Sequence, residues 1–220
     1  MSALHGQVCV VTGASRGIGR AIAELLGAEG ARLSVCAVQD KPRFGEHVAR
    51  CDVAESAQVA RFFIESEQRL GPPDVLVINA GVLERGAVDE LSEEQWDRVL
   101  DVNLKGAFLC ARAVWPSMRA RKRGRILAMG SISGTLGTKL ASAYNASKWG
   151  LTGFIKSIAE EGREHGIFCA TVLAGSTDTD MLRQTPFAPQ MTPLDVALVV
   201  RYLATDAPMA MTGSAVEVFG

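Results

Sequence analysis

The sequence lacks several features that would point to a particular class of protein. Its 220 residues carry 23 basic and 24 acidic side chains, so the formal net charge is only −1. A nearly neutral chain gives no indication of a nucleic-acid partner or of an anionic membrane surface. No apolar run approaches the roughly 18 to 20 residues that a membrane-spanning helix needs. The first six residues lack a charged stretch followed by an apolar one, so we expect no signal peptide and no membrane association.

Cysteines are few, and they are not arranged in pairs. The five stand far apart, at Cys9, Cys36, Cys51, Cys110 and Cys169. An odd number at such wide spacing does not fit a disulfide framework or a metal site. We therefore expect buried thiols, a reducing cytoplasmic location and no bound metal. The histidines His5, His47 and His165 belong to no motif, and we interpret them as surface residues.

What the sequence does contain is an alternation of short apolar runs with longer helical patterns. The apolar runs are continuous, as expected for strands that are covered on both faces. They comprise residues 7–11, 33–37, 48–51, 75–78, 125–129, 168–173 and 215–219. The helical patterns comprise residues 18–29, 56–70, 93–121, 143–164 and 193–203. This alternation predicts one α/β domain over residues 1–220, a Rossmann-like, doubly wound fold with a parallel seven-stranded sheet and helices on both faces.

One of the predicted crossovers is unusually short. About ten residues, 38–47, separate the second predicted strand from the third, and they include Pro42 and Gly45. A crossover that contains a helix usually needs at least about 10–12 residues. We therefore expect the helix after the second strand to be shortened or absent, which leaves the neighbouring face of the sheet less covered.

A tyrosine and a lysine four residues apart form a candidate catalytic pair. Tyr144 and Lys148 lie about one helical turn apart, so their side chains share one face of a helix. A neighbouring ammonium favours the phenolate, and we expect it to lower the pKa of Tyr144 enough for proton transfer near neutral pH. The same spacing also occurs by chance on solvated helices, so the pair alone leaves a surface role open.

A glycine-rich segment follows the first predicted strand directly and opens a helix. It reads Thr-Gly-Ala-Ser-Arg-Gly-Ile-Gly over residues 12–19. Gly13 permits a tight turn, Gly17 lets the backbone approach a pyrophosphate, and Gly19 allows close helix packing. The helix N-terminus offers free N–H groups and a partial positive charge to the phosphates. Between a strand and a helix, these glycines favour dinucleotide binding over a simple turn.

The glycine spacing G-x-x-x-G-x-G and the Tyr144–Lys148 pair together resemble the short-chain dehydrogenase/reductase family. Further motifs follow in the family's order along nearly the whole chain. They are Asp52 and Val53 after the third strand, Asn79, Ala80 and Gly81 after the fourth, Asn103 on the next helix, Ser131 after the fifth strand, and Gly175, Thr177 and Thr179 after the sixth. Two positions depart from the family pattern. Ile78 replaces an asparagine, and Ala174 replaces a proline, which we expect to loosen the nicotinamide pocket.

The resemblance implies an NAD(P)-dependent oxidoreductase that transfers hydride between a nicotinamide and the carbonyl carbon of a ketone or aldehyde, or the matching alcohol carbon. It makes Tyr144 the acid/base, and it makes Lys148 the residue that lowers the tyrosine pKa and binds the nicotinamide ribose. Ser131 is expected to bond the reacting oxygen, and Asn103 to hold a relay water. The implied cofactor-binding residues are Gly13, Ser15, Arg16, Gly17, Ile18, Gly19, Asp52, Val53, Asn79, Ala80, Gly81, Tyr144, Lys148, Gly175, Thr177 and Thr179.

The end of the second strand bears on the choice of cofactor. Relatives that use NAD usually place a carboxylate there for the ribose 2′-hydroxyl, whereas this chain has Ala37 and Val38. Arg16 is expected to reach a 2′-phosphate, with help from Lys41 or Arg43 in the short loop, so the sequence favours NADP(H). Asp40 in the same loop is the argument for NAD(H).

The substrate is a small carbonyl or alcohol compound that the sequence does not identify. The expected pocket walls are mostly apolar: Leu83, Ile132, Leu140, Met181, Leu182 and Phe187. The lid over residues 180–192 is short, which suggests an open site. A 3-oxoacyl compound, a sugar ketone and a xenobiotic carbonyl all remain open.

Two further expectations concern assembly and the alternative functions. The family usually forms dimers or tetramers, so we expect a homodimer or homotetramer through the helices at 93–121 and 143–164. The main alternative is a non-catalytic sensor that binds NADP(H). Relatives of that kind usually lack the tyrosine or the lysine, and both are present here. A sugar-nucleotide epimerase would need a larger substrate domain.

Overall fold

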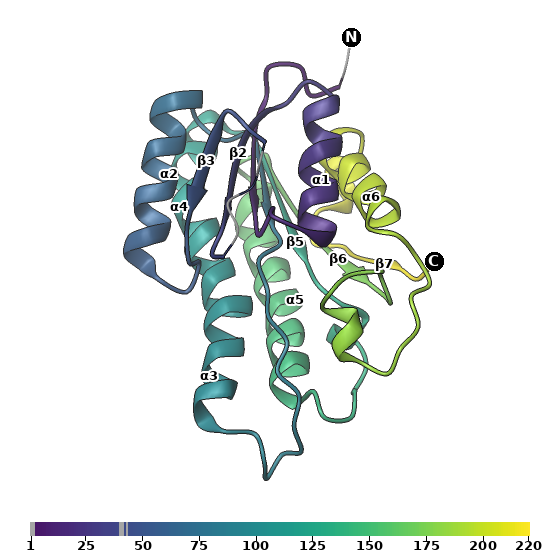
Figure 1. Ribbon diagram of the computed structural model, residues 1–220. Coiled ribbons are helices and arrows are strands. Elements are labelled where there is room, and N and C mark those ends of the chain that lie inside the picture. The colour runs from purple at the N-terminus through teal and green to yellow at the C-terminus, as the bar shows by residue number, and fades with distance from the viewer. Residues whose placement is uncertain (1–2, 40–41, 43) are drawn as a thin grey trace.

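The computed structural model describes residues 3–39, 42 and 44–220, and its centre is a parallel sheet (Figure 1). Its strands are β1 (Val8–Thr12), β2 (Arg32–Ala37), β3 (His47–Arg50), β4 (Val75–Ile78), β5 (Gly124–Met129), β6 (Ile167–Ala174) and β7 (Ala215–Val218). They lie in the order β3–β2–β1–β4–β5–β6–β7, and each neighbouring pair is parallel. The chain therefore winds outward in both directions from β1 and β4, which confirms the predicted doubly wound fold.

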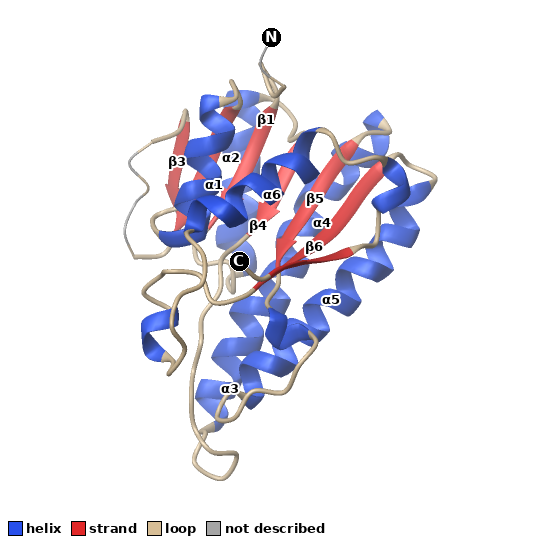
Figure 2. Cartoon of the chain, turned by 90° about the vertical axis from the view of Figure 1, so that its right-hand side faces the viewer, coloured by secondary structure: helices blue, strands red, loops and turns tan. Residues whose placement is uncertain are grey.

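Helices cover both faces of the sheet. One face carries α1 (Gly17–Ala28) and α6 (Pro193–Thr205), which lie in front of the strands in Figure 2. The other face carries α2 (Ser56–Leu70), α4 (Gly106–Arg121) and α5 (Ser142–Arg163). Successive strand residues contribute to opposite cores: Val11 packs on the α1 side and Val10 on the α2 side. This two-sided burial explains why the strands read as continuous apolar runs.

The connection from β2 to β3 contains no helix among its described residues, which are 38, 39, 42 and 44–46. The loop instead lies on the sheet: Glu46 N donates to Leu33 O at 3.0 Å, and Phe44 packs against the α1-side core. Gly45 has φ +117°, and a Cβ there would lie 3.1 Å from Val35 Cγ2. The loop therefore replaces part of the cover that a helix would give. Asp40, Lys41 and Arg43, which bear on cofactor choice, lie outside the described residues.

The pattern over residues 93–121 predicts one helix, but the structure divides it into three parts. These are α3 (Glu93–Leu100), a π-helical turn (Asp101–Lys105) and α4. A π turn carries one extra residue per turn and often occurs at functional sites. Here it contains Asn103, whose side chain is buried. The prediction of a continuous α-helix was therefore wrong at this point, because hydrophobic periodicity does not reveal a single widened turn.

The interpretation of His47 as a surface residue was also wrong. Its side chain is 2% exposed, at the start of β3 and beneath α2. The ring stacks on Phe62 with centroids 5.3 Å apart, and Nδ1 lies 2.9 Å from Ser34 Oγ. Burial lowers the pKa of His47, and the nearby Glu65 carboxylate partly opposes this. The histidine therefore serves the packing of the sheet edge, where its aromatic ring is buried like an apolar side chain.

Two further observations concern the cysteines and the helices. All five cysteines are free and buried. Within the described part of the chain, no helix combines the length and the apolar content that crossing a bilayer requires. The described histidine, cysteine and acidic side chains also form no cluster that would hold a metal ion.

Candidate active site

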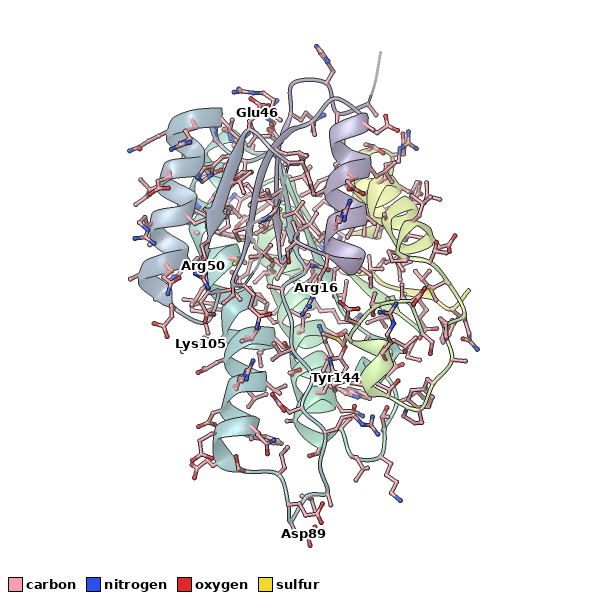
Figure 3. All side chains as sticks on the ribbon, viewed as in Figure 1. Arg16, Glu46, Arg50, Asp89, Lys105 and Tyr144 are labelled. Atoms are coloured by element: carbon pink, nitrogen blue, oxygen red, sulfur yellow. The ribbon has the colours of Figure 1, made fainter. Side chains whose placement is uncertain are left out.

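The predicted site residues gather at the carboxyl edge of the sheet. In a parallel sheet all strands end at the same edge, so segments that follow β1, β4, β5 and β6 meet there although they are far apart in the sequence. Figure 3 shows Arg16 and Tyr144 in this part of the molecule, Arg16 at the start of α1 and Tyr144 on α5. The chemistry of the protein is therefore expected at this edge.

The loop between β1 and α1 forms a cradle for phosphate. Gly13 and Gly17 have φ values of +66° and +55°, a left-handed conformation that side chains disfavour. A Cβ at Gly13 would lie 2.8 Å from Ala80 Cα, and a Cβ at Gly19 would overlap the Asn79 side chain. The first turn of α1 has neither a side-chain cap nor an acidic residue. Its N–H groups therefore face the loop without a competing anion, as a bound pyrophosphate requires.

Two residues brace this cradle from within. Thr12 Oγ1 accepts hydrogen bonds from Asn79 N at 3.0 Å and Ala80 N at 3.1 Å. Asn79 Nδ2 donates to Thr12 O and Gly13 O, each at 3.0 Å. The Asn79 side chain is thus used to hold β4 against the cradle. The sequence analysis did not predict a role for Thr12. A hydroxyl at the end of a buried apolar strand needs a hydrogen-bond partner, and this requirement could have identified it.

The other predicted cofactor-binding residues lie around the same edge. Ser15 and Ile18 are partly exposed in the cradle turn. Asp52 is also partly exposed, and its Oδ1 accepts from Ala54 N at 3.0 Å, so its carboxylate shapes the turn after β3. Val53 is buried against the start of α4, where a Cβ at Gly106 would lie 2.8 Å from Val53 Cγ2. These contacts fix the backbone of the turn after β3.

Asn103 links the π turn to α5. Its Oδ1 accepts from Val82 N at 2.8 Å, and its Nδ2 donates to Val82 O and to Ser147 Oγ, each at 3.0 Å. Ser147 Oγ in turn donates to Tyr144 O at 2.7 Å. Sequence reasoning missed Ser147, because a serine inside a helix does not reveal which partner it has. The side chain of Asn103 is therefore tied through Ser147 to the backbone of the candidate acid/base.

Lys148 is buried in the centre of the site. Its side chain is 5% exposed, and Nζ donates to Met129 O at 2.8 Å. Burial lowers the pKa of Lys148 to about 8. A Cβ at Gly81 would lie 3.7 Å from Nζ and 3.3 Å from Asn103 Oδ1. The absence of a side chain at Gly81 therefore leaves space beside the ammonium.

The expected lowering of the Tyr144 pKa is not found in this structure. Burial raises the pKa of Tyr144, and its hydrogen bond with Ser131 only partly opposes this. Lys148 Nζ lies 5.5 Å from the centroid of the tyrosine ring, over the ring itself. The helical spacing does bring the two side chains together, but the ammonium contacts the π surface of the ring, and among the described residues its hydrogen bond goes to Met129 O and not to the phenol oxygen. Sequence spacing cannot distinguish these two orientations.

The segment after β6 covers the cradle. Thr177 forms a bridge with Met191, and a Cβ at Gly17 would lie 3.3 Å from Thr179 Cγ2. Arg16 Nη1 lies 3.5 Å from Asp180 Oδ2, an ion pair between exposed side chains. Gly175 N donates to Val218 O at 2.8 Å. The backbone after Ala174 is therefore held by β7, and the loss of the family's proline does not leave it free.

The expected pocket walls are apolar and open to solvent. Leu140 and Phe187 have exposed side chains, and Leu83, Ile132, Met181 and Leu182 are partly buried. Leu140 has φ +63°, a strained conformation for a leucine, and its carbonyl accepts from Gly86 N at 3.1 Å. This hydrogen bond joins the loop after β4 to the entrance of α5.

The fold and this arrangement define a class of protein: a dinucleotide-binding α/β enzyme with a tyrosine–lysine pair at the carboxyl edge of the sheet. Residues 7–188 match the family described as short chain dehydrogenase. The chain therefore belongs to the short-chain dehydrogenase/reductase family, and it is an NAD(P)-dependent oxidoreductase.

Similar proteins cover almost the whole chain. The 3-oxoacyl-[acyl-carrier-protein] reductase MabA of Mycobacterium tuberculosis is 36% identical over 223 residues, which cover 96% of this chain and 90% of MabA. The 3-oxoacyl-[acyl-carrier-protein] reductase FabG of Escherichia coli is 32% identical, with 98% of this chain and 97% of FabG covered. Among solved structures, levodione reductase has a TM-score of 0.91 and 25% identity, with 99% of this chain and 97% of that chain covered.

Proposed function

We propose that this protein is an NADP(H)-dependent reductase of ketones or aldehydes, with Tyr144 as the acid/base and Lys148, Ser131 and Asn103 as its partners. The observation that carries the proposal is the continuous hydrogen-bonded set that joins Asn103, Ser147 and Tyr144, with Lys148 buried beside them. Residues 1–220 would then form a single dinucleotide-binding and catalytic domain.

The residues present fit a nicotinamide dinucleotide. The cradle at residues 12–19 would hold the pyrophosphate, because its glycines keep side chains out and the start of α1 offers N–H groups. Lys148 Nζ and Asn79 O lie beside Gly81, where the nicotinamide ribose would bind. The bound nicotinamide supplies or accepts the hydride, and the protein supplies position and proton.

In reduction, Tyr144 would give its phenolic proton to the carbonyl oxygen of the substrate. A raised pKa keeps the phenol protonated at neutral pH, which suits a proton donor. Ser131 would donate a hydrogen bond to the same oxygen, where negative charge develops. Lys148 keeps a positive charge at neutral pH and would stabilise the phenolate after proton transfer. Asn103 would hold the water that restores the proton.

For the substrate we propose a 3-oxoacyl compound. The two curated relatives described above are named as 3-oxoacyl reductases. An acyl chain also suits the apolar walls around Leu140 and Phe187. These side chains are exposed, so a long ligand could extend from the site into solvent. The non-catalytic sensor is the less favoured alternative, because it would have no need of the Tyr144–Lys148 pair.

We further propose a homodimer or homotetramer in the cytoplasm. Phe108 on α4 and Trp149 on α5 have side chains 43% and 54% exposed, and large apolar groups at such exposure favour a protein contact. Phe108 also meets Phe154 edge to face, with ring centroids 6.3 Å apart. Five free cysteines agree with a reducing compartment.

The proposal is tested by the variant Tyr144→Phe with NADPH and a short 3-oxoacyl thioester, followed by nicotinamide absorbance. We expect kcat to fall by at least about 100-fold while the Kd for NADPH stays within about twofold, because only the proton donor is lost. The matched control is Tyr202→Phe, since Tyr202 is the other tyrosine and lies exposed on α6. Near wild-type turnover by Tyr144→Phe would refute the acid/base assignment. If the wild type consumes no NADPH with any carbonyl tested, the sensor is favoured.

A further inference from the structure

We infer that Arg50 is, with Arg16, a ligand of the 2′-phosphate of NADP(H), and that it sets the cofactor specificity of this chain. The inference rests on the NADP(H) preference proposed above. Arg50 belongs neither to the glycine motif nor to the end of β2. It was not among the residues that the sequence predicted for cofactor binding.

Arg50 lies beside the position where a dehydrogenase chooses between the two cofactors. It is the last residue of β3 and is paired in register with Ala37 at the end of β2. Its Nε donates to Val38 O at 2.5 Å, so its guanidinium reaches across the end of β2. Ala37 and Val38 stand where a carboxylate would bind the ribose 2′-hydroxyl of NAD. A cation therefore lies next to the position that the carboxylate would occupy.

The side chain points to the face of the sheet that α1 covers. Val35 and Val48, two register pairs earlier, both pack against the α1-side core. Side chains two residues further along a strand point to the same face, so Ala37 and Arg50 do so as well. Arg16 immediately precedes α1, and Figure 3 shows Arg16 and Arg50 both at the carboxyl edge of the sheet. The two arginines thus flank the end of β2 on one face.

The short β2–β3 connection leaves Arg50 open to solvent. Its side chain is exposed, and the described residues include no carboxylate in an ion pair with it. In the described part of the chain, its Nε has a hydrogen-bond partner and its two terminal nitrogens have none. Arg121 differs, since its guanidinium is used by Asp74, Pro73 and Ser117. A guanidinium held by Nε with two free NH₂ groups matches the geometry of a phosphate.

The charges also suit a phosphate. The partner of Arg16 is Asp180, and the side chains of this pair are 63% and 53% exposed, so the ion pair is weak and a phosphate would displace it readily. Two guanidinium groups balance the charge of roughly −2 on a phosphate monoester. NADH carries only a hydroxyl at this position and would gain little from Arg50.

The test compares the Kd values of NADPH and NADH, measured by nicotinamide fluorescence, in the wild type and in Arg50→Gln. We expect the NADPH Kd to rise about tenfold and the NADH Kd to stay within about twofold, since one charge-assisted contact to the phosphate is lost. Calorimetry with 2′,5′-ADP, which carries the phosphate without the nicotinamide, should show the same loss. Arg50→Lys should recover part of the affinity.

The matched control is Arg119→Gln, which removes the same charge from an exposed position near the end of α4, at the amino edge of the sheet. It should leave both Kd values unchanged. If Arg16→Gln weakens NADPH binding but Arg50→Gln does not, the role of Arg50 is wrong and the proposed function stands. If the wild type binds NADH as tightly as NADPH, the proposed cofactor preference fails, and the role of Arg50 fails with it.

Discussion

The two ends of the candidate cofactor site are built differently. At the nicotinamide end, Asn103, Ser147 and Lys148 are buried, and each has a short hydrogen bond to a defined partner. At the adenosine end, Arg16 and Arg50 are exposed, and the described residues between β2 and β3 form no helix. Buried polar groups are costly to rearrange, whereas exposed ones can be changed with little effect on stability. We therefore expect the groups at the nicotinamide end to tolerate substitution poorly and those at the adenosine end to tolerate it well.

The largest expected effect comes from Lys148→Met at the rigid end. We expect kcat to fall by about 100-fold or more, because the positive charge beside the phenol is lost. The free energy of unfolding should rise by roughly 1–2 kcal/mol at pH 7, because a buried ammonium whose pKa is depressed to about 8 destabilises the fold. Urea unfolding measures this, with Lys156→Met, at an exposed position of α5, as the control. If Lys148→Met lowered the free energy of unfolding, the burial of the ammonium would not destabilise the fold as we expect.

A second test, at the phosphate cradle, compares Gly19→Ala with Gly153→Ala. A Cβ at Gly19 would overlap Asn79 and Gly13 O, whereas no atom lies within 4 Å of a Cβ at Gly153. We expect Gly19→Ala to lower the free energy of unfolding by about 2–4 kcal/mol, through overpacking where the backbone cannot move. Gly153→Ala should raise it by up to about 1 kcal/mol, through helix propensity. If the two variants changed the stability equally in thermal unfolding, the cradle around Gly19 would be less tightly packed than the structure indicates.

The pH dependence offers a third test. The pKa of Lys148 is lowered from 10.5 to about 8 in the folded protein. Below pH 8 both the folded and the unfolded state hold the proton. Between about pH 8 and 10.5 the folded state loses it first, so this group makes stability rise with pH. Over the same range kcat/KM should fall as the ammonium is lost. A kcat/KM that rises steadily through pH 9 would show that the charge on Lys148 is not needed.

The smallest effect is expected from Phe44→Ala in the loop after β2. Phe44 packs on the α1-side core but stays partly exposed, so we expect a loss of only about 1–2 kcal/mol. The Kd for NADPH should rise less than threefold, because Arg50 bonds to Val38 O of this loop and not to Phe44. A collapse of cofactor binding would mean that the adenosine end is as rigid as the nicotinamide end, and the comparison would then fail.

The sequence predicted the features that depend on local pattern. Continuous apolar runs identify strands covered on both faces, and glycine spacing after β1 identifies the cradle. It did not predict the π turn at Asn103, because one widened turn leaves the hydrophobic period intact. Thr12 and Ser147 were missed because their partners come from distant segments. The pKa of Tyr144 was predicted in the wrong direction, since helical spacing fixes the proximity of Lys148 but not the direction of its ammonium.

The short connection between β2 and β3 also has a consequence for how the chain folds. Ser34 and His47, which pair across these strands, are 13 residues apart, the smallest separation among the parallel pairs of the sheet. Parallel pairing is normally slow, because a long loop must close before any contact forms. Here that entropic cost is at its lowest in the molecule. The edge of the sheet that carries Arg50 is therefore the place where strand pairing can begin earliest.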